Sequence, residues 1–131
     1  MTTLHAVDYS GSTEPTLAEQ VLNQIADQSG PTDVALTFDH RIIAVAPARQ
    51  ARSLINGPQG GSGCLQEILD RAVMLGAKTV TLYTDCQFEI RNLRYHGLTV
   101  NCVLVSPSSE AVYARKAAKD AGWPVIAEVS N

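Results

Sequence analysis

The sequence predicts a single α/β domain over residues 1–131, with a doubly wound, mostly parallel sheet and helices on both faces. Short apolar runs alternate with amphipathic segments of helical period along the whole chain. The run 98–105 is almost continuously apolar, as expected of a parallel strand that is buried on both faces. One connection is too short for a crossover, which predicts one antiparallel strand at an edge of the sheet.

The first strand and helix are predicted from residues 4–31. The apolar run 4–9 predicts a buried strand, and it ends in small polar residues that are typical of a loop. Pro15 suits the first turn of a helix, and the segment 29–31, Ser-Gly-Pro, ends it. The apolar residues of this helix share one face: Leu17, Val21, Leu22 and Ile25.

A hairpin follows. The runs 33–38 and 41–46 are rich in β-formers, and only Asp39 and His40 separate them. Such a tight connection predicts that the two strands pair antiparallel. The segment 47–58 is ambiguous, with a short helix expected around residues 50–54.

The next elements continue the alternation. Residues 65–72 show helical spacing of apolar side chains, and Gly76 ends that helix. The run 79–84 predicts a strand that ends at Asp85. Phe88, Ile90 and Leu93 suggest a further helix to about Tyr95.

The C-terminal part predicts a strand at 98–105, a helix from Ser108 or Ser109 to Ala121, and a last strand at 125–129. The complete order is β-α-β-β-α-β-α-β-α-β. Such an order is Rossmann-like, with parallel strands joined by helical crossovers.

Composition and charge limit the classes of partner and the cellular compartment that we expect for this protein. The net charge is -3 and aromatic residues make up 5%, so neither a basic surface nor a base-stacking platform indicates a nucleic-acid partner. The start of the sequence lacks the features of a signal peptide, and no run approaches the ~20 apolar residues of a membrane helix. Three cysteines without Cys-x-x-Cys spacing fit a reducing compartment, and we expect a cytoplasmic protein.

Three loops carry residues with hard oxygen atoms. They are 8–12, directly after the first strand, 60–62, directly before a helix, and 84–85, directly after a later strand. In open α/β sheets, ligands bind outside the carboxyl ends of the strands, where the strand order reverses. Carboxylates and neutral oxygens suit one Mg²⁺ ion, or Mn²⁺ or Ca²⁺ in its place. The proposed metal ligands are Asp8, Ser10, Ser12, Ser62 and Asp85.

The motif Asp-x-Ser-Gly-Ser at 8–12 resembles the metal-ion-dependent adhesion site (MIDAS) of von Willebrand factor A-like (VWA) domains. Ser62 stands where that family usually has Thr, and Asp85 matches its aspartate after the fourth strand. Cys86 stands where Gly is usual, and the family's final helix is missing. The chain looks like a compact VWA-like domain of bacterial or phage type.

The resemblance implies a binding module, not an enzyme. The bound cation would complete its coordination with a Glu or Asp of a partner protein, and the domain would serve as an adaptor or inhibitor. The oligomeric state is left open.

Two alternatives stand beside this interpretation. The segment 79–87 also resembles the fourth strand of ribonuclease H-like nucleases, in which Asp8, Glu67 and Asp85 would hold catalytic metals. The second alternative is a vestigial VWA-like protein that binds no metal and acts in assembly. Cys64 and Cys86 lie near the proposed site and are interpreted as reduced, semi-buried thiols.

Overall fold

The computed structural model describes residues 2–8, 15–38, 42–54, 65–86, 93–105 and 111–129 of the chain. In chain order its elements are β1 (Thr3–Asp8), α1 (Pro15–Gln28), β2 (Val34–Phe38), β3 (Ile42–Pro47), the 3-10 segment η1 (Ala48–Leu54), α2 (Leu65–Met74), β4 (Thr79–Thr84), β5 (Thr99–Val105), α3 (Ala111–Ala121) and β6 (Val125–Val129). No helix within the described ranges is long and apolar enough to cross a membrane.

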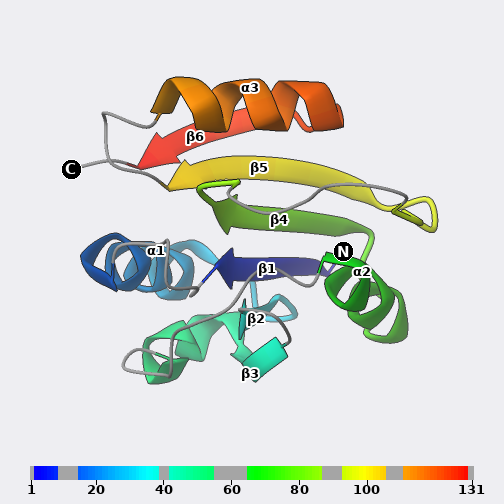
Figure 1. Cartoon of the computed structure of the whole chain (residues 1–131). Coiled ribbons are helices and arrows are strands. Elements are labelled where there is room, and N and C mark those ends of the chain that lie inside the picture. Colours follow the sequence, from blue (N-terminus) through cyan, green and yellow to red (C-terminus); the bar gives the residue numbers. More distant parts are fainter. Residues whose placement is uncertain are drawn as a thin grey trace.

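The strands form one sheet in the order β3-β2-β1-β4-β5-β6 (Figure 1). Neighbouring strands are parallel, except that β2 and β3 are antiparallel. The predicted mixed sheet with one antiparallel edge strand is therefore confirmed. The chain builds outward from β1 on both sides, first to β2 and later to β4, so the strand order reverses between β1 and β4.

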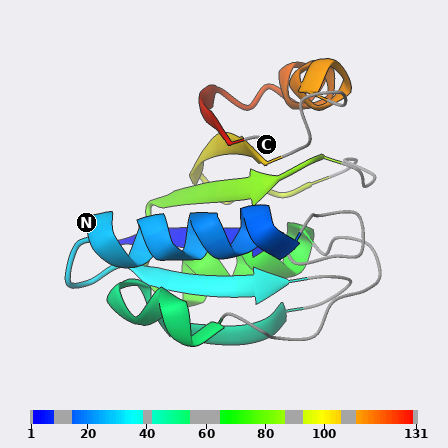
Figure 2. The same ribbon diagram turned by 90° about the vertical axis from the view of Figure 1, so that its left-hand side faces the viewer.

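Helices cover both faces of the sheet (Figures 1 and 2). Successive side chains of a strand point to opposite faces. In β1, Leu4 and Ala6 pack in the core beneath α2 and α3, whereas Val7 packs in the core beneath α1 and η1. The sheet is thus the middle layer of a three-layer structure.

The helices end as their sequences predict. α2 ends at Met74, and Gly76 in the turn that follows has a φ of +74° that costs little only for glycine. The amide of Ala77 donates to the carbonyl of Ala72, and the amide of Gly76 donates to that of Val73. These bonds satisfy the last carbonyls of the helix and turn the chain into β4.

The prediction that a helix runs from Phe88 to Tyr95 is wrong for its last residues, because residues 93–95 have no regular secondary structure. The earlier part, 87–92, lies outside the described residues. His96 and Gly97 both have positive φ, and the amide of Leu98 donates to the carbonyl of Tyr95, so the chain makes a tight turn here. The Gln66 side chain on α2 bonds both the amide and the carbonyl of Arg94 and holds this segment against the helix.

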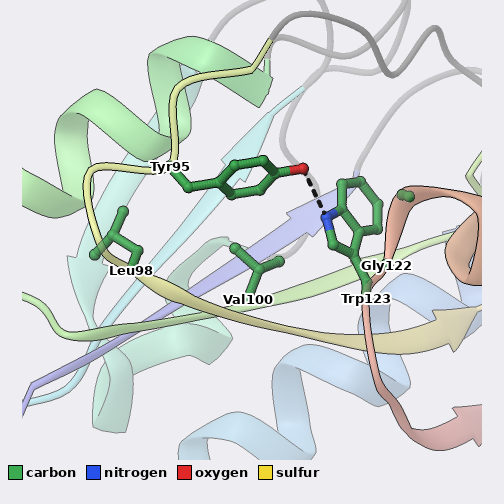
Figure 3. Close-up of a pocket in the computed structure, with 6 residues that line it drawn as sticks. Tyr95, Leu98, Val100, Gly122 and Trp123 are labelled. Atoms are coloured by element: carbon green, nitrogen blue, oxygen red, sulfur yellow. Dashed lines mark hydrogen bonds between the residues drawn. The ribbon is translucent and has the colours of Figure 1, made fainter.

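A pocket of about 240 Å³ lies beside this turn, over the first half of β5 (Figure 3). The indole Nε1 of Trp123 donates to the hydroxyl of Tyr95 across 3.2 Å and joins the two sides of the pocket. The lining residues are Tyr95, Leu98, Val100, Ala121, Gly122 and Trp123.

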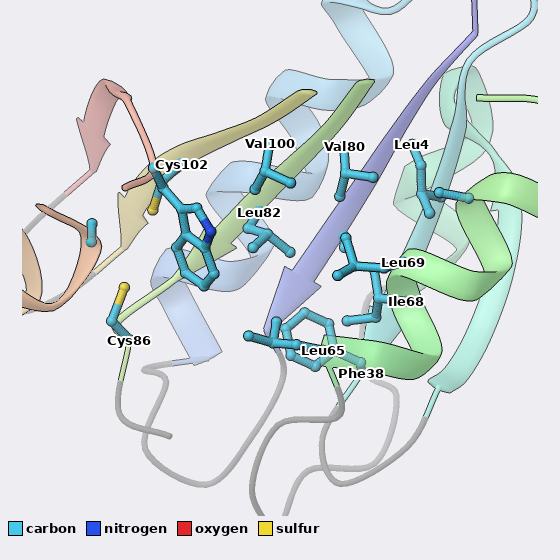
Figure 4. Close-up of a cluster of buried hydrophobic side chains, with 14 of the residues drawn as sticks. Leu4, Phe38, Leu65, Ile68, Leu69, Val80, Leu82, Cys86, Val100 and Cys102 are labelled. Atoms are coloured by element: carbon cyan, nitrogen blue, oxygen red, sulfur yellow. The ribbon is translucent and has the colours of Figure 1, made fainter. Parts of the chain in front are cut away.

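The larger hydrophobic core lies between the sheet and the helices α2 and α3 (Figure 4). Each fully buried leucine or phenylalanine contributes about 1.5–3 kcal/mol relative to exposure. The core extends to Cys86, directly beyond β4, and therefore reaches the carboxyl end of the central strands. Its buried members include Leu4, Phe38, Leu65, Ile68, Leu69, Val80, Leu82 and Cys102.

Candidate functional site

The two predicted aspartate ligands lie at the carboxyl ends of the two central strands. β1 and β4 pair in parallel from Thr3–Thr79 to Val7–Tyr83, which brings Asp8 level with Thr84. Asp85 follows directly after β4. Both aspartates thus stand at the point where the strand order reverses, as the sequence predicted.

Asp8 is held by a side chain of the neighbouring strand. The Thr84 hydroxyl donates to Asp8 Oδ2 at 2.7 Å, and the amide of Cys86 donates to the Thr84 oxygen at 3.0 Å. A hydroxyl has one proton, and here that proton is directed to Asp8 while the oxygen accepts from Cys86. Asp8 Oδ2 is therefore the acceptor of this bond.

This network is buried. Asp8, Thr84 and Asp85 are each no more than 2% exposed. Burying a carboxylate is costly unless hydrogen-bond donors or a cation compensate its charge. The Thr84 hydroxyl is one such donor for Asp8. Two carboxylates at one end of the sheet are a donor set of the kind that Mg²⁺ prefers.

The backbone makes a left-handed turn at Cys86, with a φ of +59°. Such a φ is unusual for a residue with a side chain, and it explains why glycine is the usual residue at this place in the family that the sequence resembles. The strained residue donates the amide hydrogen bond that fixes Thr84.

The thiols of Cys86 and Cys102 lie together beneath this turn, both free and buried (Figure 4). The hydrogen bond with Cys102, burial, and the charges of Asp85 and Asp8 all raise the pKa of the Cys86 thiol. Cys86 is therefore a neutral thiol at neutral pH and not a thiolate ligand. The expectation of a reduced, semi-buried thiol holds for Cys86, whereas Cys64 lies outside the described residues.

The remaining predicted ligands, Ser10, Ser12 and Ser62, also lie outside the described residues. Among the residues that are described, no group of three or more His, Cys, Asp or Glu side chains could hold a metal ion. The described part of the site is thus an aspartate pair with Thr84, and a complete metal site needs the oxygen atoms of the two serine-bearing loops.

The nuclease arrangement is not formed. Asp8, Glu67 and Asp85 are all described, and they do not make a metal-binding group. Glu67 is exposed in the first turn of α2, where Leu65 and Ile68 are the side chains that face the core. In addition, α1 separates β1 from β2, and the two strands are parallel. A nuclease of the ribonuclease H type would instead have antiparallel strands directly after the first aspartate.

A second polar cluster lies on the other face of the same two strands. The His5 Nδ1 and the Tyr83 hydroxyl are hydrogen-bonded at 2.8 Å, and Asp33 Oδ2 is 3.7 Å from His5 Nε2. The amides of Thr3 and Gly30 both donate to the Asp33 carboxylate at 3.0 Å. Burial lowers the pKa of His5 and raises that of Tyr83 to about 12, so both are neutral at neutral pH.

The sequence alone does not indicate that Thr84 is the partner of Asp8. The feature of the sequence that points to this partnership is the hydroxyl-bearing residue directly before Asp85, at the end of a strand that pairs with β1. Only the register between the strands shows that this hydroxyl lies level with Asp8.

Comparison with known proteins supports the fold. The sequence matches no protein-family model and no curated protein. Among solved structures, the chain is similar to an aerotolerance-related membrane protein from Bacteroides fragilis that carries multiple mutations to serines. The TM-score is 0.61 at 12% identity, over 100% of this chain and 91% of that chain. That protein is VWA-like.

The chain has a von Willebrand factor A-like fold. The VWA-like architecture expected from the sequence is therefore confirmed. At 12% identity the likeness concerns the fold alone and carries no information on a metal.

Proposed function

We propose that this VWA-like domain binds a divalent cation at the carboxyl end of its sheet and uses it to capture a carboxylate of a partner protein. The observation that carries the proposal is the burial of Asp8 and Asp85 at the ends of adjacent central strands. Two like charges at one buried place repel one another, and a cation between them would stabilise both.

Asp8 and Asp85 would hold the ion, and Ser10, Ser12 and Ser62 would supply neutral oxygen atoms. Mg²⁺ is the first candidate, and Mn²⁺ and Ca²⁺ accept similar ligands. With only two protein charges the ion keeps a net affinity for anions, so a Glu or Asp side chain from outside would complete its coordination.

The role that follows is an adaptor or inhibitor, with no reaction of its own. We also propose the reducing cytoplasm as its compartment, which suits an odd number of cysteines, two of them free and buried. The main alternative is a metal-free assembly role for the same fold.

Thermal melting tests the proposal, because a ligand of the folded state raises the melting temperature. The wild type and Asp8→Ala would be melted in EDTA and in magnesium, manganese or calcium chloride. We expect Mg²⁺ or Mn²⁺ to raise the midpoint of the wild type alone. At a cation concentration of about 100 times Kd, the gain is about 2.7 kcal/mol. A wild type that none of the cations stabilises would support the metal-free role instead.

A further inference from the structure

The thiols of Cys86 and Cys102 meet between neighbouring strands of the sheet. Cys102 lies in β5, in register with Leu82 of β4, and Cys86 follows β4 directly. Figure 4 shows the two sulfur atoms pointing toward one another in the hydrophobic core. Both thiols are free, and they are hydrogen-bonded to one another. The fold thus brings into contact two cysteines that are distant in the sequence.

This contact is close to the geometry of a disulfide. Bonded cysteines have Cα atoms about 4.4–6.8 Å apart and sulfur atoms about 2.05 Å apart. Neighbouring strands of a sheet are about 4.8 Å apart, which suits a bond between β5 and the residues directly after β4. Because hydrogen-bonded thiols already touch, a movement of about 1 Å at each sulfur closes the bond. The bond can therefore form within the folded sheet.

The two thiols differ in their access to solvent. Cys86 is 7% exposed, whereas Cys102 is fully buried. A reagent from solvent therefore meets Cys86 first, and Cys102 is the resolving thiol. The hydrogen bond with Cys102, burial, and the charges of Asp85 and Asp8 raise the pKa of the Cys86 thiol, and neutral thiols react slowly. The reduced pair consequently persists until an oxidant has accumulated.

We propose that Cys86 and Cys102 are a redox-modification site, at which a small-molecule disulfide such as glutathione disulfide oxidises the pair to an intrachain disulfide. First, the Cys86 sulfur attacks one sulfur of glutathione disulfide, and its proton passes to the glutathione thiol that leaves. The Cys102 sulfur then attacks the Cys86 sulfur, and its proton passes to the second glutathione thiol that leaves. The cysteine pair loses two electrons, and glutathione disulfide is reduced to two thiols. In a reducing compartment such a bond is transient.

The new bond fixes the turn on which the Asp8 network rests. The Cys86 amide donates to the Thr84 oxygen, and the Thr84 hydroxyl donates to Asp8. A bond to Cys102 ties this turn to β5 and closes a loop over residues 87–101. Closing a loop of this length restricts the unfolded chain, so the oxidised protein should melt about 10 °C higher than the reduced protein. The proposal is independent of the cation site, and both forms would be melted in EDTA.

Equilibration in buffers of reduced and oxidised glutathione tests the proposal. The Cys64→Ser variant would be studied beside the wild type, because Cys86 and Cys102 are then the only cysteines of the chain. Folded reduced protein and urea-unfolded protein would both be transferred into the same buffer, so that slow reaction of buried thiols is not mistaken for a stable reduced state. Free thiols would then be alkylated in denaturant and the peptides identified by mass spectrometry. We expect the Cys86–Cys102 disulfide from both starting points.

The matched control is Cys102→Ser in the Cys64→Ser background, which removes only the resolving thiol. This variant should stop at a mixed disulfide of Cys86 with glutathione. Two alkylated thiols, or glutathione adducts alone, in Cys64→Ser from both starting points would overturn the proposal. So would a wild type that pairs Cys64 with either of the other cysteines, or a Cys86–Cys102 disulfide that lowers the melting midpoint.

Discussion

Two polar clusters lie along the same strand pair, β1 and β4, one half-buried around His5 and one buried around Asp8, and they are built differently. In the first, His5 and Tyr83 are neutral, and the only carboxylate, Asp33, accepts two backbone amides. At the carboxyl ends of the two strands, Asp8 and Asp85 bring two buried carboxylates to one end of the sheet. The first cluster holds one carboxylate, which two backbone amides stabilise, whereas the second holds two carboxylates, a donor set that suits a cation.

The difference teaches that burial of polar groups is not by itself a sign of function. The His5 cluster joins β1 to β4 and to the turn before β2, and the amides of Thr3 and Gly30 stabilise its carboxylate. Variants of the two clusters should therefore respond differently to metal ions.

The largest effect is expected at Thr84. Thr84→Val removes the hydroxyl that donates to Asp8 and accepts from the Cys86 amide, and it leaves both groups buried. A buried charged acceptor and a buried amide that both lose a partner cost about 3 kcal/mol. Urea unfolding in EDTA would measure this loss, and stabilisation by Mg²⁺ should weaken in the same variant.

Thr84→Ser is the matched control, because it keeps the hydroxyl and removes only a methyl group, at a cost of about 1 kcal/mol. If Thr84→Val and Thr84→Ser unfold within about 0.5 kcal/mol of one another, the hydroxyl does not organise the site.

A smaller effect is expected at Cys86, whose φ of +59° is strained for any residue with a Cβ. Cys86→Gly should be about 1 kcal/mol more stable than Cys86→Ala, the reverse of the usual order of glycine and alanine. Both variants lose the thiol, so their difference isolates the backbone strain. Denaturant unfolding of the pair in EDTA measures it, and an alanine variant as stable as the glycine variant would show that the turn relaxes.

The smallest effect is expected at His5. Burial lowers the pKa of His5 below its usual 6.5, so the unfolded chain binds a proton more readily than the folded chain. Stability from this residue is full above pH 6.5 and falls as the pH drops through 6.5 toward the lower folded pKa.

His5→Gln should flatten the stability profile between pH 7.5 and pH 5 and leave Mg²⁺ stabilisation unchanged, as urea unfolding at each pH would show. A variant whose stability falls with acid as steeply as that of the wild type would contradict the burial of a neutral His5.

The strands and most helices, and the places of Asp8 and Asp85 directly after two of the strands, could be predicted because they depend on local patterns. Apolar periodicity marks each strand, and the short link after Phe38 requires the antiparallel pair. Once β1 and β4 are neighbours, residues that directly follow them must meet at the same edge.

The rest depends on contacts between distant parts of the chain. The apolar spacing of Phe88, Ile90 and Leu93 fits a helix, but Gln66 binds the backbone of Arg94, and His96 and Gly97 turn the chain. The partnership of Thr84 with Asp8 required the strand register. The left-handed conformation of Cys86 was indicated only by the glycine that is usual at this place in the family that the sequence resembles.

Direct detection of bound Mn²⁺ tests the central claim, that Asp8 and Asp85 form a cation site. Electron paramagnetic resonance would count free Mn²⁺ during titration of the wild type, Asp8→Asn and Asp85→Asn, with His5→Gln as the control from the other cluster. We expect one bound Mn²⁺ per chain in the wild type and in His5→Gln, displaced by Mg²⁺, and none in the two asparagine variants. Equal Mn²⁺ binding by all four proteins, or none by the wild type, would contradict the account.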